Sequence, residues 1–152
     1  MRLAQTTDAA SLACLINTAF QVESFFIDGD RICEEEVQGL LCRGSFLIME
    51  DDRGLAGCVY IEIQSERGYL GLLSVCPSRQ QQGTGRMLMA AAEDLARRAG
   101  CRFMDLRVVN LRTELPSFYR RLGYEETGVE PFPGDVLTKL PCHFVVMTKA
   151  LI

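Results

Sequence analysis

A strand, a polar loop with two glycines, a long helix and a second strand follow one another between Tyr69 and Val109. Apolar residues fill Tyr69–Cys76 and Cys101–Val109, and the segment between them carries apolar side chains at the 3.6-residue period of a helix. Two strands joined through a helix normally lie parallel in one sheet, because the crossover returns the chain to the same end of the sheet. This unit therefore predicts an α/β or α+β fold.

Further strands are expected on both sides of this unit. They cover Arg2–Thr6, Ser45–Glu50, Leu55–Gln64, Tyr124–Gly128 and Cys142–Lys149. Turns at Asp51–Gly54 and Arg67–Gly68 connect three consecutive strands into an antiparallel meander. Helices are expected at about residues 9–20, 32–44, 84–99 and 115–122. We expect one domain over residues 1–152, with a mixed, mostly antiparallel seven-stranded sheet and about four helices.

Composition excludes several classes of protein. The formal net charge is −4, which argues against nucleic-acid binding driven by a net positive charge. No apolar run approaches the length needed to span a bilayer, so we expect a soluble cytoplasmic protein. The seven cysteines are odd in number and no two are separated by two residues, which favours neither a disulfide framework nor a zinc site. We expect free thiols, a reducing compartment and no metal.

The loop between the first of these strands and the long helix carries the motif Gln80-x-x-Gly83-x-Gly85. Glycines at a strand-to-helix junction let a ligand approach the backbone, and the first N–H groups of the helix then form an anion site suited to a pyrophosphate. A dinucleotide fingerprint would need glycine at the position of Leu88, and a P-loop would need lysine at the position of Arg86. Taken alone, the motif also fits a turn that binds nothing.

A second motif lies downstream, where Asn110 follows the strand and the short helix contains and ends within Phe118-Tyr119-Arg120-Arg121-Leu122-Gly123-Tyr124. Together the two motifs resemble the GNAT superfamily of acyl-CoA-dependent N-acetyltransferases, over about residues 45–129. The resemblance implies a GNAT-like fold in which two central strands splay apart. It also implies acetyl-CoA as the acyl donor.

The resemblance assigns roles to individual residues. In the family, backbone groups at the positions of Leu73, Ser74 and Val75 pair with the pantetheine arm of the cofactor. The loop that would hold the pyrophosphate consists of Gln80, Gln81, Gln82, Gly83, Thr84, Gly85 and Arg86. Asn110 matches a polar residue that contacts the pantetheine arm, and Tyr119 matches a tyrosine whose hydroxyl lies near the thioester sulfur.

The chemistry explains why a tyrosine is needed. Attack of an amine on a thioester expels a thiolate, which a tyrosine hydroxyl can protonate. We therefore expect Tyr119 to be the general acid, the alternative being an aromatic that only packs. Some relatives carry a glutamate general base where this chain has Tyr69. Glu62 is a substitute, but a solvated carboxylate on a strand explains it as well, so the base stays unassigned.

These observations predict an N-acetyltransferase that moves the acetyl group of acetyl-CoA to a primary amine by direct attack in a ternary complex. A non-catalytic acyl-CoA-binding sensor or scaffold is the alternative. In the family the acceptor binds between two segments that match Phe20–Arg31 and Glu130–Pro141 here. The partner is a small-molecule or peptide amine, with neither nucleic acid nor membrane involved. Analogy with the family allows a homodimer.

Overall fold

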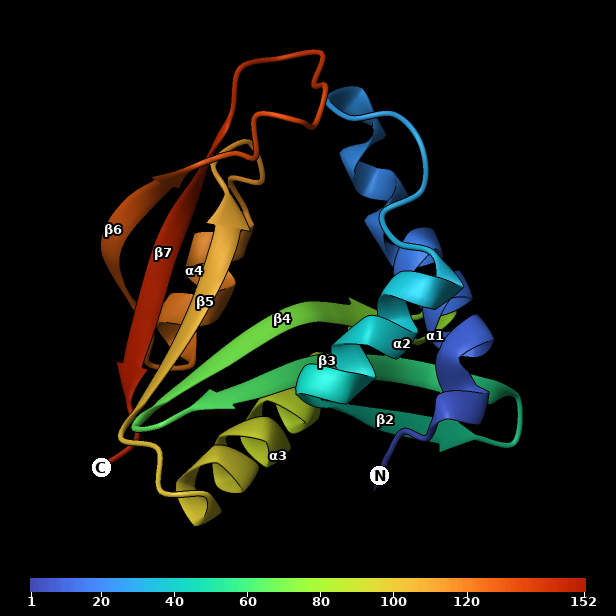
Figure 1. Cartoon of the computed structure of the whole chain (residues 1–152), viewed down its shortest axis with the longest axis vertical. Coiled ribbons are helices and arrows are strands. Elements are labelled where there is room, and N and C mark those ends of the chain that lie inside the picture. Colours follow the sequence, from blue (N-terminus) through green and yellow to red (C-terminus); the bar gives the residue numbers. More distant parts are fainter.

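The computed structural model describes residues 1–152 and forms a single open sheet of seven strands (Figure 1). The strands are β1 (Arg2–Leu3), β2 (Ser45–Asp51), β3 (Gly54–Gln64), β4 (Arg67–Val75), β5 (Phe103–Val109), β6 (Glu125–Pro131) and β7 (His143–Ala150). Their order across the sheet is β1-β2-β3-β4-β5-β7-β6. Only β4 and β5 run parallel, as the crossover predicted, and the other pairs are antiparallel.

Helices cover both faces of this sheet. They are α1 (Ala9–Phe20), α2 (Glu34–Arg43), α3 (Thr84–Arg98) and α4 (Leu115–Arg121), with short 3₁₀ turns η1 (Thr6–Asp8), η2 (Gln21–Phe25) and η3 (Pro77–Arg79). Along β3, Val59 and Ile61 enter the core beneath α3, whereas Cys58 and Tyr60 enter the core beneath α1 and α2. Because both faces of this strand are apolar, the sheet is buried on both sides at β3. The predicted fold class is confirmed.

Some local expectations were wrong. The turn between β3 and β4 lies at Ser65–Glu66, where Ser65 has a φ of 57°. The mixed composition of Gln21–Arg31 predicts a loop, but its first five residues form η2. Helical periodicity also predicts Ala99 on the buried stripe of α3, but Ala99 is exposed, because the stripe repeats every four residues through Leu88, Ala92 and Ala96. None of the helices is both long enough and apolar enough to cross a membrane.

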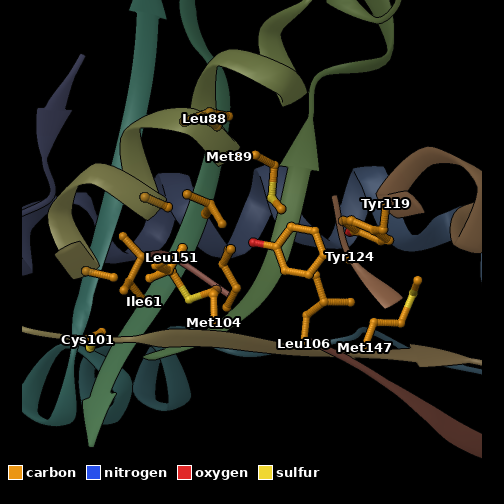
Figure 2. Close-up of a cluster of buried hydrophobic side chains, with 14 of the residues drawn as sticks. Ile61, Leu88, Met89, Cys101, Met104, Leu106, Tyr119, Tyr124, Met147 and Leu151 are labelled. Atoms are coloured by element: carbon orange, nitrogen blue, oxygen red, sulfur yellow. The ribbon is translucent and has the colours of Figure 1, made fainter. Parts of the chain in front are cut away.

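The core beneath α3 surrounds Tyr124 (Figure 2). This side chain is buried, and its hydroxyl donates a hydrogen bond to Oε2 of the buried Glu93 at 2.9 Å. Nζ of Lys149 donates to the other oxygen of Glu93 at 2.8 Å, so the buried carboxylate is fully paired. Figure 2 places Tyr119 beside Tyr124 at the margin of this cluster. The core therefore fixes the position of α4 against the sheet.

The central strands separate after a short paired stretch. Residues Arg67–Leu70 of β4 pair with Phe103–Leu106 of β5, and beyond them the two strands diverge as a V (Figure 1). A bulge in the pairing of β3 with β4 follows at once, and there Leu72 has a φ of 53°, a left-handed conformation that is rare for leucine. The predicted splayed pair is confirmed, and the bulge turns β4 away from its neighbour.

Candidate active site

The first wall of the V is the free edge of β4. The Cys76 N–H donates to the Ala56 carbonyl oxygen on β3 at 2.8 Å. Because backbone groups alternate between the two edges of a strand, those of Val75 and Leu73 face the V. Ser74 lies between them with its side chain buried, and its hydroxyl donates to the Leu72 carbonyl oxygen at 3.0 Å. The edge thus offers the backbone groups of Leu73 and the N–H of Val75, whereas the Val75 carbonyl oxygen already accepts from Gln80 Nε2 at 3.3 Å.

The second feature is the anion loop, Gln80–Arg86, which begins α3. The backbone N–H groups from Gln81 to Arg86 have no acceptor within the protein, because the first intrahelical bonds start beyond them. Gly83 precedes the helix with a φ of 82°, a conformation that costs glycine little. Six consecutive free donors at the positive end of a helix form an anion site.

The V, the anion loop and α4 meet at Gly85. A Cβ atom placed on Gly85 would lie 3.7 Å from Val75 Cγ2 and 3.7 Å from Phe118 Cζ. The free edge of β4 therefore runs directly into the anion loop, and the residue that precedes Tyr119 borders the same point. The structure brings together three segments that are separate in the sequence.

Tyr119 lies in α4, next to Phe118. Its side chain is 9% exposed and packs edge-on against Phe118 and Tyr124. Burial raises the pKa of Tyr119 to about 12, against the opposing charge of Arg112, so the phenol stays protonated at neutral pH. No protein group hydrogen-bonds its hydroxyl, so that hydroxyl is free to donate to a ligand that reaches it.

Asn110 closes the far end of β5. Its N–H donates to the His143 carbonyl oxygen at 2.9 Å, and its Oδ1 accepts from the His143 N–H at 2.8 Å. Only the Nδ2 group remains free to contact a ligand. His143, the one histidine, has an exposed side chain and contributes to the structure through its backbone.

The two segments expected around an acceptor do meet, above the V in Figure 1. The Lys139 N–H donates to the Phe26 carbonyl oxygen at 2.6 Å, and Lys139 Nζ donates to the Ser24 carbonyl oxygen at 3.0 Å. An ion pair of 2.9 Å joins Nζ to Asp28 as well. Phe26 itself is 0% exposed and belongs to the core, so its ring is unavailable to an acceptor.

A second contact ties η2 to the end of β5. Nη1 of Arg112 lies 3.0 Å from Oε2 of Glu23, and both side chains are largely buried. Burial raises the pKa of Glu23, and the charge of Arg112 opposes that rise. Arg112 is also the positive charge that acts on Tyr119, so it connects the acceptor segment to the tyrosine.

A hollow of about 360 Å³ opens on the α1/α2 face of the sheet, beside the point where β4 and β5 part. It is lined by Glu62, Gln64, Arg67, Gly68, Tyr69, Asp105, Leu106, Arg107, Thr127, Glu130, Val146 and Thr148. Of these residues, the sequence singles out Glu62, Tyr69 and Glu130. The sequence also carries a signal for Asp105 and Arg107. They alternate along β5 with the buried Met104, Leu106 and Val108, so their side chains lie on the opposite face of the sheet.

Cys76 lies on the face of the sheet opposite α3. It packs with the core beneath α1, and its pKa is lowered by hydrogen bonds with Ser78 and Arg79. Its Sγ accepts from Arg79 Nη1 at 3.2 Å. No three His, Cys, Asp or Glu side chains come close enough to hold a metal ion.

Comparison with known proteins decides the family. Residues 42–126 match the family model described as an acetyltransferase (GNAT) domain, which is more than half of the chain. The chain belongs to the GNAT acetyltransferase family. The match covers the anion loop, the V and Tyr119, so the two sequence motifs identified the family correctly.

Two acetyltransferases are similar to this chain in sequence. Streptothricin acetyltransferase from Streptomyces lavendulae is 30% identical over 88 residues, which are 57% of this chain. That stretch is 47% of the relative, so the chain spans about half the length of the curated protein that it matches. The crystal structure of a nourseothricin acetyltransferase is 25% identical, with a TM-score of 0.66 over 72% of this chain and 66% of that one.

The fold is shared over almost the whole length with yncA, a putative acetyltransferase from Salmonella typhimurium solved with its cofactor acetyl-CoA. The TM-score is 0.76 at 20% identity, over 99% of this chain and 92% of that one. This likeness supports the GNAT fold of the complete sheet, including the strands outside residues 42–126.

Proposed function

We propose that this GNAT protein transfers the acetyl group of acetyl-CoA to a primary amine by direct attack within a ternary complex. The observation that carries the proposal is the run of six free N–H groups from Gln81 to Arg86, which begins where the free edge of β4 ends. A pyrophosphate needs such donors, and an extended amide-bearing arm needs an unpaired strand edge. The acetyl-CoA bound to the Salmonella relative supports the same ligand.

The residues proposed to bind the cofactor offer different chemical groups to it. Leu73 and Val75 would pair with the amides of the pantetheine arm, and Ser74 holds the strand between them. Asn110 would contribute its Nδ2 group to the arm. In the anion loop, Gln80, Gln81, Gln82, Gly83, Thr84, Gly85 and Arg86 would contribute mainly backbone donors, since the Thr84 side chain is buried and that of Gln80 is bonded to the Val75 carbonyl oxygen.

The transfer exchanges one bond at the acetyl carbon for another. The neutral amine nitrogen attacks the thioester carbonyl, its C–N bond forms, and the C–S bond breaks once the amine has lost a proton. The departing sulfur takes a proton from the Tyr119 hydroxyl, which the raised pKa keeps protonated. The proton released by the amine restores the tyrosine through solvent, so the protein is unchanged after each turnover.

The acceptor would reach the V from the hollow on the α1/α2 face. Glu62 lies there beside Tyr69, its partner across the strands, and the loop that carries Lys139 covers the approach. The curated relative is a streptothricin acetyltransferase, which supports a small-molecule amine as acceptor. We propose that residues 1–152 make up one N-acetyltransferase domain.

Two measurements test this proposal. Calorimetric titration should show CoA and acetyl-CoA binding, and a thiol-release assay over a panel of amines should show acetyl-CoA consumption that depends on the amine. Binding without thiol release for any amine would favour the alternative of an acyl-CoA sensor. Absence of binding, in a protein whose circular dichroism shows it folded, would contradict both.

A further inference from the structure

The charged groups of the hollow differ in how far they are already paired within the protein. Those left available indicate which charges the acceptor has. Arg67 and Asp105 neutralise each other, because Nε and Nη2 of the arginine donate to the two carboxylate oxygens at 2.7 Å each. The Thr148 hydroxyl donates a third hydrogen bond to Asp105 at 2.7 Å. This pair is complete within the protein and has little left to offer a ligand.

Arg107 is the available cation. Its guanidinium lies over the ring of Tyr69 at 5.0 Å and near that of Phe144 at 5.6 Å, so two aromatic rings hold it in place. One carboxylate oxygen of Glu130 approaches Nη1 at 3.4 Å, and the two side chains are 41% and 49% exposed. A guanidinium has five N–H donors, and this single exposed contact leaves most of them unused.

Glu62 is the available anion. No lysine or arginine lies within ion-pair distance of it, and its one hydrogen-bond partner is the Tyr60 hydroxyl at 3.2 Å from Oε2. Burial raises the pKa of Tyr60 to about 12, so this hydroxyl keeps its one proton at neutral pH, which Glu62 shares with the Leu40 carbonyl oxygen, also at 3.2 Å. The second oxygen of Glu62 is left for a cationic ligand.

Glu62 on β3 is the register partner of Tyr69 on β4. The Arg107 guanidinium reaches over the Tyr69 ring from β5, two residues beyond Asp105, which is the register partner of Tyr69. Glu62 and Arg107 both line the hollow, so it presents a carboxylate and a guanidinium around one phenol ring, beside the opening of the V. An α-amino acid carries the two opposite charges that would pair with these groups.

From this arrangement we propose that the acceptor is an α-amino acid, with its ammonium group held toward Glu62 and its carboxylate on Arg107. The inference rests on the proposed function and narrows its acceptor to one chemical class. Arg107 is then a specificity-determining residue, because it binds a group of the acceptor that takes no part in the transfer.

The test compares matched acceptors on the wild-type chain at saturating acetyl-CoA. L-Amino acids are offered beside their amides and their decarboxylated amines, and thiol release gives kcat/KM for each. At least one amino acid should exceed its own amide by about tenfold or more, the range for a hydrogen bond to a charged group. If the amides and amines are acetylated as well as every amino acid, or if no amino acid is acetylated, the inference is wrong.

A pair of variants locates the effect. Arg107→Met keeps a long unbranched side chain beside Tyr69 and removes the charge, so KM for the preferred amino acid should rise about 10- to 100-fold while that for its amide stays within twofold. Arg102→Met changes an exposed arginine outside the hollow and should alter neither. Equal losses for acid and amide in Arg107→Met would overturn the assignment. Failure of the proposed function looks different, because thiol release would then occur with no acceptor of any class, whether or not acetyl-CoA binds.

Discussion

The anion loop and the hollow are built in opposite ways. The loop uses seven consecutive residues and offers mainly backbone N–H groups. The hollow takes its charged side chains from β3, β4, β5 and β6, which are distant in the sequence. A backbone site is tolerant of side-chain change as long as glycine allows the path of the chain, whereas a side-chain site changes whenever one strand residue does. The comparison indicates why one scaffold can keep its cofactor and vary its acceptor.

Tyr119 lies between the anion loop and the hollow. Loss of its hydroxyl should lower the rate of acetyl transfer without changing acetyl-CoA binding or stability. Tyr119→Phe keeps the ring in its packed position, and kcat should fall about 10²- to 10⁴-fold, as for loss of a general acid. Because the pKa of Tyr119 is raised to about 12, the hydroxyl stays protonated and the ratio of wild-type to variant kcat should stay constant from pH 6 to 10. Stopped thiol-release assays from pH 6 to 10 measure this.

Calorimetry and thermal unfolding are the controls for Tyr119→Phe, and both should match the wild type. A variant with normal kcat and reduced stability would show that Tyr119 only packs. Loss of acetyl-CoA affinity together with kcat would place the hydroxyl in the cofactor site.

Breaking the contact between Glu23 and Arg112 should damage the acceptor side only. Arg112→Met leaves a buried carboxylate without its partner and should cost about 3 kcal/mol in the free energy of unfolding at pH 7.5. The pKa of Glu23 is already raised, so the carboxylate takes up a proton on acidification and the deficit should shrink toward pH 5. Urea unfolding at the two pH values tests this.

The double variant Glu23→Gln with Arg112→Met removes both charges and should recover most of the lost stability. Its dissociation constant for CoA should stay within about threefold of the wild type, since neither residue borders the anion loop. A deficit that is independent of pH would mean that the Arg112 side chain contributes by packing rather than by charge.

Gly83→Asn should damage the cofactor side only. Asparagine accepts the left-handed conformation better than most residues, and its Cβ meets no protein atom within 4 Å. It would instead occupy the space above the free N–H groups, so the dissociation constant for CoA should rise about tenfold or more, the cost of losing one hydrogen bond to a charged group.

Gly100→Asn is the matched control at the other end of α3, where glycine also has a positive φ and open space. Thermal unfolding should show a similar small loss for both variants, and calorimetry should show weaker binding for Gly83→Asn alone. Equal CoA affinity in the two would contradict the assignment of the anion loop.

Lys139→Met should have the smallest effect. The ion pair with Asp28 is exposed, so the KM of the amine should rise about twofold to fivefold and the CoA affinity should not change. Lys139→Arg should restore the wild-type value. A larger change in CoA affinity than in the KM of the amine would show that this loop does not serve the acceptor.

The sequence predicted the structural elements around the anion loop better than those around the hollow. Seven strands, four helices and the parallel crossover followed from periodicity, and Gly83 and Gly85 marked the helix start because a local motif needs only neighbouring residues. Phe26 was expected near the acceptor but is part of the core, since an aromatic in a loop gives no sign of its direction. The pairing of Arg67 with Asp105, which leaves Arg107 available, depends on the register of β4 with β5 and cannot be read from either strand alone.

The six unpaired amides of the anion loop give the protein a natural reporter of occupancy. An amide without an acceptor exchanges its proton with solvent quickly even in a stable domain, so Gln81 to Arg86 should exchange fast in the free protein. A bound phosphate oxygen would accept from several of them and slow their exchange, while the interior of α3 stays unchanged. Exchange rates at these residues would therefore give the bound fraction of cofactor residue by residue, without any label on the ligand.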